Sequence, residues 1–179
     1  MLVKSFGAAV QGINATIVTI EVNVNQGIKF FLVGLPDNAV KESHERIASA
    51  LDYTGYKLPR KQIVINMAPA DIRKEGSAYD LPLAIGMMVA AEAIKSEELD
   101  KYIIMGELSL DGTVQPIKGV LPIAIKAREE GFKGFILPKQ NAREAAVVNN
   151  LEVFGVESIS EVLEFFDGKL VLEDRKSVV

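Results

Sequence analysis

The feature that most constrains the fold is the stretch from Leu81 to Ile94, which is apolar on nearly every side of a helix. A surface helix keeps a polar face, so a helix that lacks one must be buried on several sides. We therefore expect residues 81–94 to form the central helix of the domain. Pro82 falls in its first turn, where a missing amide proton does no harm. Asp80 is the expected N-terminal cap, although Ser77 with Asp80 also resembles a capping box.

Length and composition suit one globular domain. The chain has 179 residues, of which 49% are apolar and 25% charged, and its formal net charge is −4. This composition excludes a disordered chain. It also argues against a stand-alone nucleic-acid-binding protein, because phosphate neutralisation ordinarily requires a basic excess. Contact with DNA would need a local basic patch or several copies of the chain in a ring.

The residue inventory excludes several kinds of site. The chain has no cysteine and one histidine, so thiol chemistry and a His-rich zinc site are excluded and no metal site is expected. No Gly-x-x-x-x-Gly-Lys-Ser/Thr phosphate loop occurs, and we expect no cofactor in this chain. No apolar run approaches the ~20 residues of a membrane span. Since no export signal is visible either, we expect a cytoplasmic protein without membrane contact.

Alternation of apolar residues predicts strands in the N-terminal third. Residues 15–24 place Val18, Ile20, Val22 and Val24 on one face. A turn at 25–27 leads into a second alternating run at 28–32. We expect these two strands to form an antiparallel hairpin.

A helix is expected next, with Asp37 or Asn38 as its cap, an apolar stripe that includes His44, and Gly55 as its stop. His44 could be a general base. No paired nucleophile accompanies it, so we interpret it as a partly buried core or edge histidine.

The rest of the chain alternates strands and helices. The pattern predicts strands at 62–67, 135–137 and 151–154, a hairpin at 102–117 around Asp111-Gly112, and helices at 119–130, 141–149 and 158–168. Hairpins followed by alternating elements give an α+β class that approaches α/β. Residues 1–168 form the predicted domain. Residues 169–179 show no clear periodicity and are predicted to be a tail or the start of a linker.

One motif could carry chemistry. Lys74-Glu75-Gly76-Ser77-Ala78 precedes the central helix, and Lys118-Gly119-Val120-Leu121 follows downstream. A serine at a helix N-terminus beside a desolvated lysine can form a Ser–Lys hydrolase, in which the lysine is the base and backbone amides hold the oxyanion. The alternative is that Ser77 is only a cap or loop residue.

Five motifs in order give a family resemblance over residues 2–168. They are Thr-Ile-Glu-Val at 19–22, LVGLPDNAVKES at 32–43, KEGSAYDLPLAIG at 74–86, GELSLDGTVQPIKG at 106–119 and LPKQN at 137–141. They resemble the N-terminal domain of ComM-type (YifB) magnesium-chelatase-like proteins and, more distantly, the proteolytic domain of Lon proteases. The resemblance implies a ribosomal protein S5 domain 2-like fold. It also implies a ring-forming AAA+ ATPase that acts in DNA processing and branch migration during natural transformation.

The resemblance to Lon further implies that catalysis is lost. Lon has Asp-Gly-Pro-Ser-Ala-Gly before its central helix, and with Glu75 and Gly76 matched to its first two residues the nucleophile position is Ala78. The position of the Lon lysine is Leu121. Because a helix turns about 100° per residue, Ser77 would direct its hydroxyl elsewhere. Both dyad positions are aliphatic, so we expect no catalytic residue in this chain.

The remaining role is that of a scaffold. The resemblance implies a separate AAA+ module that holds ATP and Mg²⁺, so the partners would be that module, neighbouring subunits of a hexameric ring, and DNA. Candidate contacts with DNA or a partner are the basic residues Arg73, Lys74, Lys118, Lys57, Arg60 and Lys61. The alternative for each is solvated surface charge. A Ser–Lys peptidase that uses Ser77 and a small-molecule-binding module remain the alternative functions.

Overall fold

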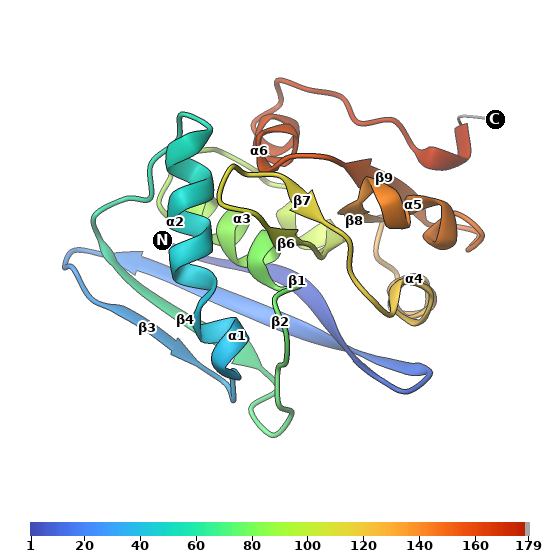
Figure 1. Cartoon of the computed structure of the whole chain (residues 1–179), viewed down its shortest axis with the longest axis horizontal. Coiled ribbons are helices and arrows are strands. Elements are labelled where there is room, and N and C mark those ends of the chain that lie inside the picture. The colour runs from blue at the N-terminus through green and yellow to red at the C-terminus, as the bar shows by residue number, and fades with distance from the viewer. Residues whose placement is uncertain (178–179) are drawn as a thin grey trace.

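A seven-stranded mixed sheet forms the frame of the protein, in a computed structural model that describes residues 1–177 (Figure 1). Its strands lie in the order β3-β4-β2-β1-β5-β8-β9. The bounds are β1 Leu2–Gln11, β2 Asn14–Asn25, β3 Phe30–Val33, β4 Gln62–Ala68, β5 Tyr102–Ile104, β8 Gly134–Pro138 and β9 Glu152–Val156. A separate antiparallel pair consists of β6 Glu107–Leu108 and β7 Val114–Gln115.

Six α-helices are present in the described part of the chain. They are α1 Asn38–Lys41, α2 Ser43–Tyr53, α3 Asp80–Ala90, α4 Val120–Glu129, α5 Lys139–Ala145 and α6 Ile159–Phe166. Short 3₁₀ turns, η1 and η2, occur at Leu99–Lys101 and Arg175–Ser177. Strand β2 pairs antiparallel with β1 and β4, whereas the other neighbours in the large sheet pair parallel. The predicted α+β class is confirmed. No helix within residues 1–177 is both long enough and apolar enough to cross a bilayer.

Helix α3 is the central helix, as predicted. Every residue from Asp80 to Ala90 is buried. The helix packs on β1 and β2 and is covered by α2, α6 and β6. Gly86 permits the close approach to the sheet, because a Cβ there would lie 3.0 Å from Val22 Cγ2 and 3.2 Å from Ser5 Oγ. The helix ends at Ala90, earlier than the predicted Ile94, and Glu92 beyond it has a φ of +61°.

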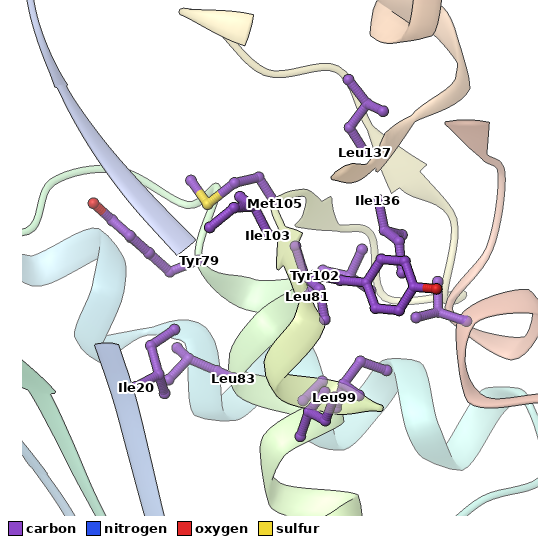
Figure 2. Close-up of a cluster of buried hydrophobic side chains, with 14 of the residues drawn as sticks. Ile20, Tyr79, Leu81, Leu83, Leu99, Tyr102, Ile103, Met105, Ile136 and Leu137 are labelled. Carbon is purple, nitrogen blue, oxygen red and sulfur yellow. The ribbon is translucent and has the colours of Figure 1, made fainter. Parts of the chain in front are cut away.

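The core spreads from α3 to the parallel half of the sheet. Figure 2 shows Leu81 and Leu83 of α3 and Tyr102 and Ile103 of β5 as members of one cluster of buried side chains. Tyr102 also meets Phe165 and Phe166 of α6 edge to face, with ring centroids 5.6 Å and 5.8 Å away. This packing joins the C-terminal strands and helix to the same core.

Of the three N-terminal strands, one was predicted correctly, one was predicted with the wrong pairing partner, and one was missed. Alternation correctly identified β2, whose buried face carries Val18, Ile20 and Val22. The predicted hairpin of residues 15–24 with 28–32 is wrong, because β3 pairs parallel with β4. The strand that forms a hairpin with β2 is β1, which precedes it in the chain and was not predicted.

The C-terminal half largely follows the predicted elements. Helix α4 ends just before Gly131, whose φ is +81°. The predicted strand from 102 to 110 is instead divided into β5 and β6, and α5 covers 139–145 rather than 141–149. Beyond α6, Asp174 Oδ1 accepts a hydrogen bond of 3.1 Å from the Val153 amide, and Lys176 Nζ donates to the Leu151 carbonyl at 2.6 Å. The last described residues thus contact β9, and residues 178–179 lie outside the described residues.

Asp80 joins two elements, α2 and β6, to the start of α3. Its buried carboxylate accepts hydrogen bonds from Ser43 Oγ at 2.6 Å, Arg46 Nε at 2.7 Å and the Leu108 amide at 3.0 Å. The hydrogen bond between Arg46 and Asp80 raises the pKa of Arg46. The prediction that Asp80 caps α3 is therefore wrong, since its side chain bonds to α2 and β6. Ser77 does not complete a capping box either, because its hydroxyl bonds to Glu107.

Lys74 ties the loop before α3 to the end of β3. Its side chain is wholly buried, and its ammonium donates to the Gly34 carbonyl at 2.7 Å and to the Pro69 carbonyl. Burial lowers the pKa of Lys74. The expectation that Lys74 contacts DNA or a partner is therefore wrong, because the ammonium is enclosed by its own chain.

Removing the Asp80 carboxylate should destabilise the protein strongly. In Asp80→Ala, the Arg46 guanidinium loses its buried partner, and we expect the free energy of unfolding to fall by roughly 3–5 kcal/mol. Urea denaturation followed by circular dichroism measures this change. Glu98→Ala, which removes an exposed ion pair with Lys101, is the control and should have little effect. Equal loss in both variants would contradict the role given to Asp80.

Replacing Lys74 by methionine should cost about 1–3 kcal/mol of stability, because the Gly34 and Pro69 carbonyls lose their donor. The pH dependence has a defined sign. With a lowered pKa in the folded state, the unfolded chain binds more protons between that pKa and the ordinary lysine value, so wild-type stability should rise with pH in that window. Lys74→Met should lack this rise, and Lys57→Met, at an exposed lysine, should keep it. Urea unfolding across alkaline pH measures both.

Candidate functional site: a cleft at the start of α3

A cleft of about 480 Å³ opens where the loop before α3 meets the end of β1, β6 and the segment before α4. Several elements that are far apart in the sequence therefore contribute to one site. Its lining includes Ala8, Val10, Glu75, Ser77, Ala78, Tyr79, Met105, Glu107 and Lys118. The two motifs singled out in the sequence, 74–78 and 118–121, thus meet at the same place.

The hydroxyl of Ser77 is bonded to a carboxylate. Ser77 Oγ donates to Glu107 Oε2 at 2.7 Å. Backbone bonds hold the two partners in place, because the Gly106 amide donates to the Ala78 carbonyl at 2.8 Å and the Leu81 amide donates to the Gly106 carbonyl at 3.0 Å. Among the described residues, no lysine is hydrogen-bonded to Ser77. The hydroxyl therefore lacks the amine base that a Ser–Lys dyad requires.

The dyad positions inferred from Lon carry no reactive group. Ala78 lines the cleft and presents a methyl group. Leu121 lies in the first turn of α4 and packs against the core. Lys118 does line the cleft, but it stands on the segment before α4. Tyr79 is the other hydroxyl of the cleft, and burial raises its pKa, so it stays neutral at physiological pH.

Two polar side chains shape the walls of the cleft. Asp37, one of the two predicted caps, caps α1 by accepting from the Val40 amide at 2.8 Å, and its other oxygen accepts from the Gly76 amide at 3.0 Å. The single helix predicted after it is divided into α1 and α2. Asn141 accepts from the Ile117 amide at 2.9 Å and donates to the Ile117 carbonyl at 3.1 Å. The loops on both sides of the cleft are therefore held to the fold by side chains.

Sequence reasoning missed the roles of Glu107 and Asn141. Both stand inside the quoted motifs, Glu107 in GELSLDG and Asn141 at the end of LPKQN. The motifs therefore carried the signal, but no short-range pattern indicates that Glu107 meets Ser77, because 30 positions separate them.

The candidate basic residues lie in different places. Arg73 is exposed and pairs with Glu75, with Nε 3.5 Å from Oε1. Lys118 shares the cleft with Glu75 and Glu107. Lys57, Arg60 and Lys61 are exposed on the segment between α2 and β4. With Lys74 buried, the structure does not bring the six predicted residues together.

His44 lies outside the cleft. Its ring packs on Phe30, with centroids 4.3 Å apart, and 36% of its side chain is exposed. This placement agrees with the interpretation as an edge histidine. Across residues 1–177, no three His, Cys, Asp or Glu side chains gather in a way that could hold a metal ion.

The geometry allows binding more readily than hydrolysis. The cleft has the size of small-ligand pockets, roughly 300–1,000 Å³, and both carboxylate and ammonium groups line it. The Ser77 hydroxyl lacks an amine base, so acyl transfer by a Ser–Lys dyad of the Lon type has no starting step. The hypothesis of a small-molecule-binding module stays a prediction.

Comparison with known proteins shows which family and which proteins the chain is similar to. The family model of subunit ChlI of Mg-chelatase matches residues 20–141. The chain is 38% identical to the uncharacterized protein YifB of Escherichia coli (strain K12) over 169 residues, covering 94% of this chain and 33% of YifB. It is also 38% identical to competence protein ComM of Haemophilus influenzae over 165 residues, covering 92% and 32% of the two chains.

A more distant similarity connects the chain with proteases. It is 32% identical to Lon protease 2 of Bacillus subtilis over 126 residues, which covers 69% of this chain and 22% of that protein. These similarities confirm the resemblance inferred from the five motifs. The chain spans about one third of the length of the YifB and ComM proteins it matches. The match over residues 20–141 shows that the chain belongs to the Mg-chelatase-like family of AAA+ proteins defined by subunit ChlI.

Proposed function

We propose that the chain is a non-catalytic, Lon-protease-like domain of a ComM/YifB-type AAA+ ATPase. In this proposal it supports assembly of the ring and engages DNA during DNA processing and branch migration in natural transformation, in the cytoplasm. Its partners are the AAA+ module, neighbouring subunits of a hexameric ring, and DNA. The similarity to competence protein ComM supports this context.

The hydrogen bond between Ser77 and Glu107 is the observation that carries the non-catalytic part of the proposal. It occupies the hydroxyl nearest the Lon nucleophile position with a carboxylate at 2.7 Å. The aliphatic residues Ala78 and Leu121 remove the alternative of a dyad in the positions used by Lon. A Ser–Lys peptidase that uses Ser77 is therefore disfavoured.

ATP and Mg²⁺ would bind outside these 179 residues. The chain contains no Gly-x-x-x-x-Gly-Lys-Ser/Thr phosphate loop, and within residues 1–177 no three His, Cys, Asp or Glu side chains gather to hold a metal ion. An ATPase activity of the whole protein would therefore need the AAA+ module of the longer relatives. The role of this chain would be to position that module.

The segment 57–61 is the best candidate for DNA contact. It contributes Lys57, Arg60 and Lys61, and no acidic residue occurs from position 53 to 70. Arg73 pairs with Glu75 instead, and Lys118 lines the same cleft as Glu75 and Glu107. Since phosphate binding rests on positive charge that is free to release counterions, the unpaired segment suits it better.

The absence of a catalytic serine can be tested directly. A fluorophosphonate probe labels activated serines, and we expect no labelling of the wild-type chain, because Ser77 has no amine base. In-gel fluorescence measures the product. Ser77→Ala is the matched variant. Labelling of the wild type that disappears in Ser77→Ala would contradict the non-catalytic assignment.

DNA engagement should depend on the basic segment. We expect the 179-residue chain to bind a fluorescent oligonucleotide weakly at low salt and to lose affinity as salt rises, because phosphate contacts release counterions. The double variant Arg60→Glu with Lys61→Glu should abolish binding in fluorescence anisotropy.

The control for this test carries the same change of charge elsewhere. Lys139→Glu with Arg143→Glu alters α5, which packs on β8 and β9 at the other end of the sheet from β3. It should retain most of the affinity. Equal loss in both double variants, or no loss in either, would argue against a DNA-binding role for residues 57–61.

A further inference from the structure

A second cavity lies beside the segment 57–61, apart from the cleft at α3. Its volume is about 300 Å³, at the lower end of the range for ligand pockets. The segment crosses from α2 to β4 and passes the start of β3. The cavity is lined by Ile28, Phe30, His44, Leu58, Pro59, Arg60, Lys61 and Ile63.

One wall of this cavity is aromatic. The rings of Phe30 and His44 lie 4.3 Å apart with an interplanar angle of 35°. Both side chains are only partly buried, and Ile28 next to them is 90% exposed. Buried Ile63, the residue of β4 that is paired with Phe30, also lines the cavity. An exposed apolar and aromatic surface of this kind suits the flat face of a nucleobase, which stacks on Phe or His side chains.

The rim of the cavity is positively charged. Arg60 and Lys61 are exposed, and no ion pair within residues 1–177 involves them or Lys57. Glu45 places a carboxylate near the aromatic wall, with Oε1 3.9 Å from His44 Nδ1. In a chain with a net charge of −4, the rim is a local positive site. Its charge is complementary to phosphate.

The aromatic wall and the positively charged rim together favour one class of ligand over the others. A duplex hides its base faces and offers only phosphates to such a surface, so it would leave the aromatic wall unused. An acidic peptide would satisfy the cations but has no need of a flat aromatic wall. A single strand supplies both groups, because its unstacked bases and its phosphates alternate.

We propose that this cavity binds single-stranded DNA, with one base against Phe30 and His44 and the flanking phosphates on Arg60 and Lys61. The inference rests on the proposed role in DNA engagement and names the form of DNA that this site takes. Specificity for the single strand comes from the aromatic wall. Affinity at low salt comes from the cations.

The first experiment separates stacking from charge. Fluorescence anisotropy of the 179-residue chain with labelled hexadeoxyadenylate should show a fivefold or greater loss of affinity in Phe30→Leu, the order expected for a lost base–aromatic contact. The slope of log K against log salt should stay unchanged in this variant. In Arg60→Gln it should become shallower by about 0.7, the value for one single-strand phosphate contact.

The matched control is Phe132→Leu. Phe132 is likewise a partly buried aromatic residue and packs edge to face on Phe6, with centroids 5.3 Å apart, away from the basic segment. It should bind hexadeoxyadenylate like the wild type. A duplex of equal length should bind the wild type and Phe30→Leu equally. Loss of duplex binding in Phe30→Leu would overturn the stacking role.

A second measurement does not depend on how well a variant folds. His44 is the single histidine of the chain, so its imidazole protons can be followed by NMR without ambiguity. Hexadeoxyadenylate should shift these signals through the ring current of a stacked base, whereas the duplex and a glutamate hexapeptide should not. Equal shifts with the peptide would overturn base recognition in favour of simple charge binding.

Failure of this inference can be told from failure of the proposed function. If Arg60→Glu with Lys61→Glu abolishes DNA binding while Phe30→Leu binds hexadeoxyadenylate like the wild type, DNA engagement stands and the base pocket is wrong. If the wild-type chain binds neither single-stranded nor duplex DNA at low salt, both are wrong.

Discussion

The burial of α3 is the constraint on which the rest of the structure depends. A helix enclosed on all sides can carry a charge only if that charge finds partners inside the fold. Asp80 is the one charged residue of α3, and its carboxylate is satisfied by Ser43, Arg46 and the amide of Leu108. The same bonds place α2 and β6 against the start of the helix. The position of Glu107, next to Leu108 on β6, follows from that contact.

The cleft is thus a consequence of how the central helix is buried. Ser77 lies just before α3, and Glu107 is brought to it by the strand that Asp80 holds. On the other side, Lys74 and Asp37 attach the preceding loop to residues 34–37. A site built this way keeps its shape without catalytic groups. The proposed absence of a dyad is therefore compatible with an intact Lon-like fold.

Local patterns predicted the elements better than their partners. The alternation in β2 and β4 identified both strands and their buried faces, because only one face of each strand is fully buried. Strand β1 escaped notice because Gly7, Ala8 and Ala9 supply no alternation of large apolar residues. The turn at 25–27 suggested a hairpin with β3, but β4 pairs with β2 at that edge. Pairing is decided by the whole sheet, and a short turn signal cannot show it.

The sequence was enough to locate the candidate site, but it could not show which of the charged side chains near it are buried. Ala78 and Leu121 could be placed from the motifs alone, whereas the burial of Lys74 could not, since it depends on two carbonyls brought near it by the fold. Because Lys74 is buried, it offers no positive charge to a phosphate backbone. Lys118 lines the same cleft as the carboxylates of Glu75 and Glu107, which repel a phosphate backbone. Residues 57–61 contain no acidic residue, so the proposed DNA contact is assigned to this segment and not to the cleft.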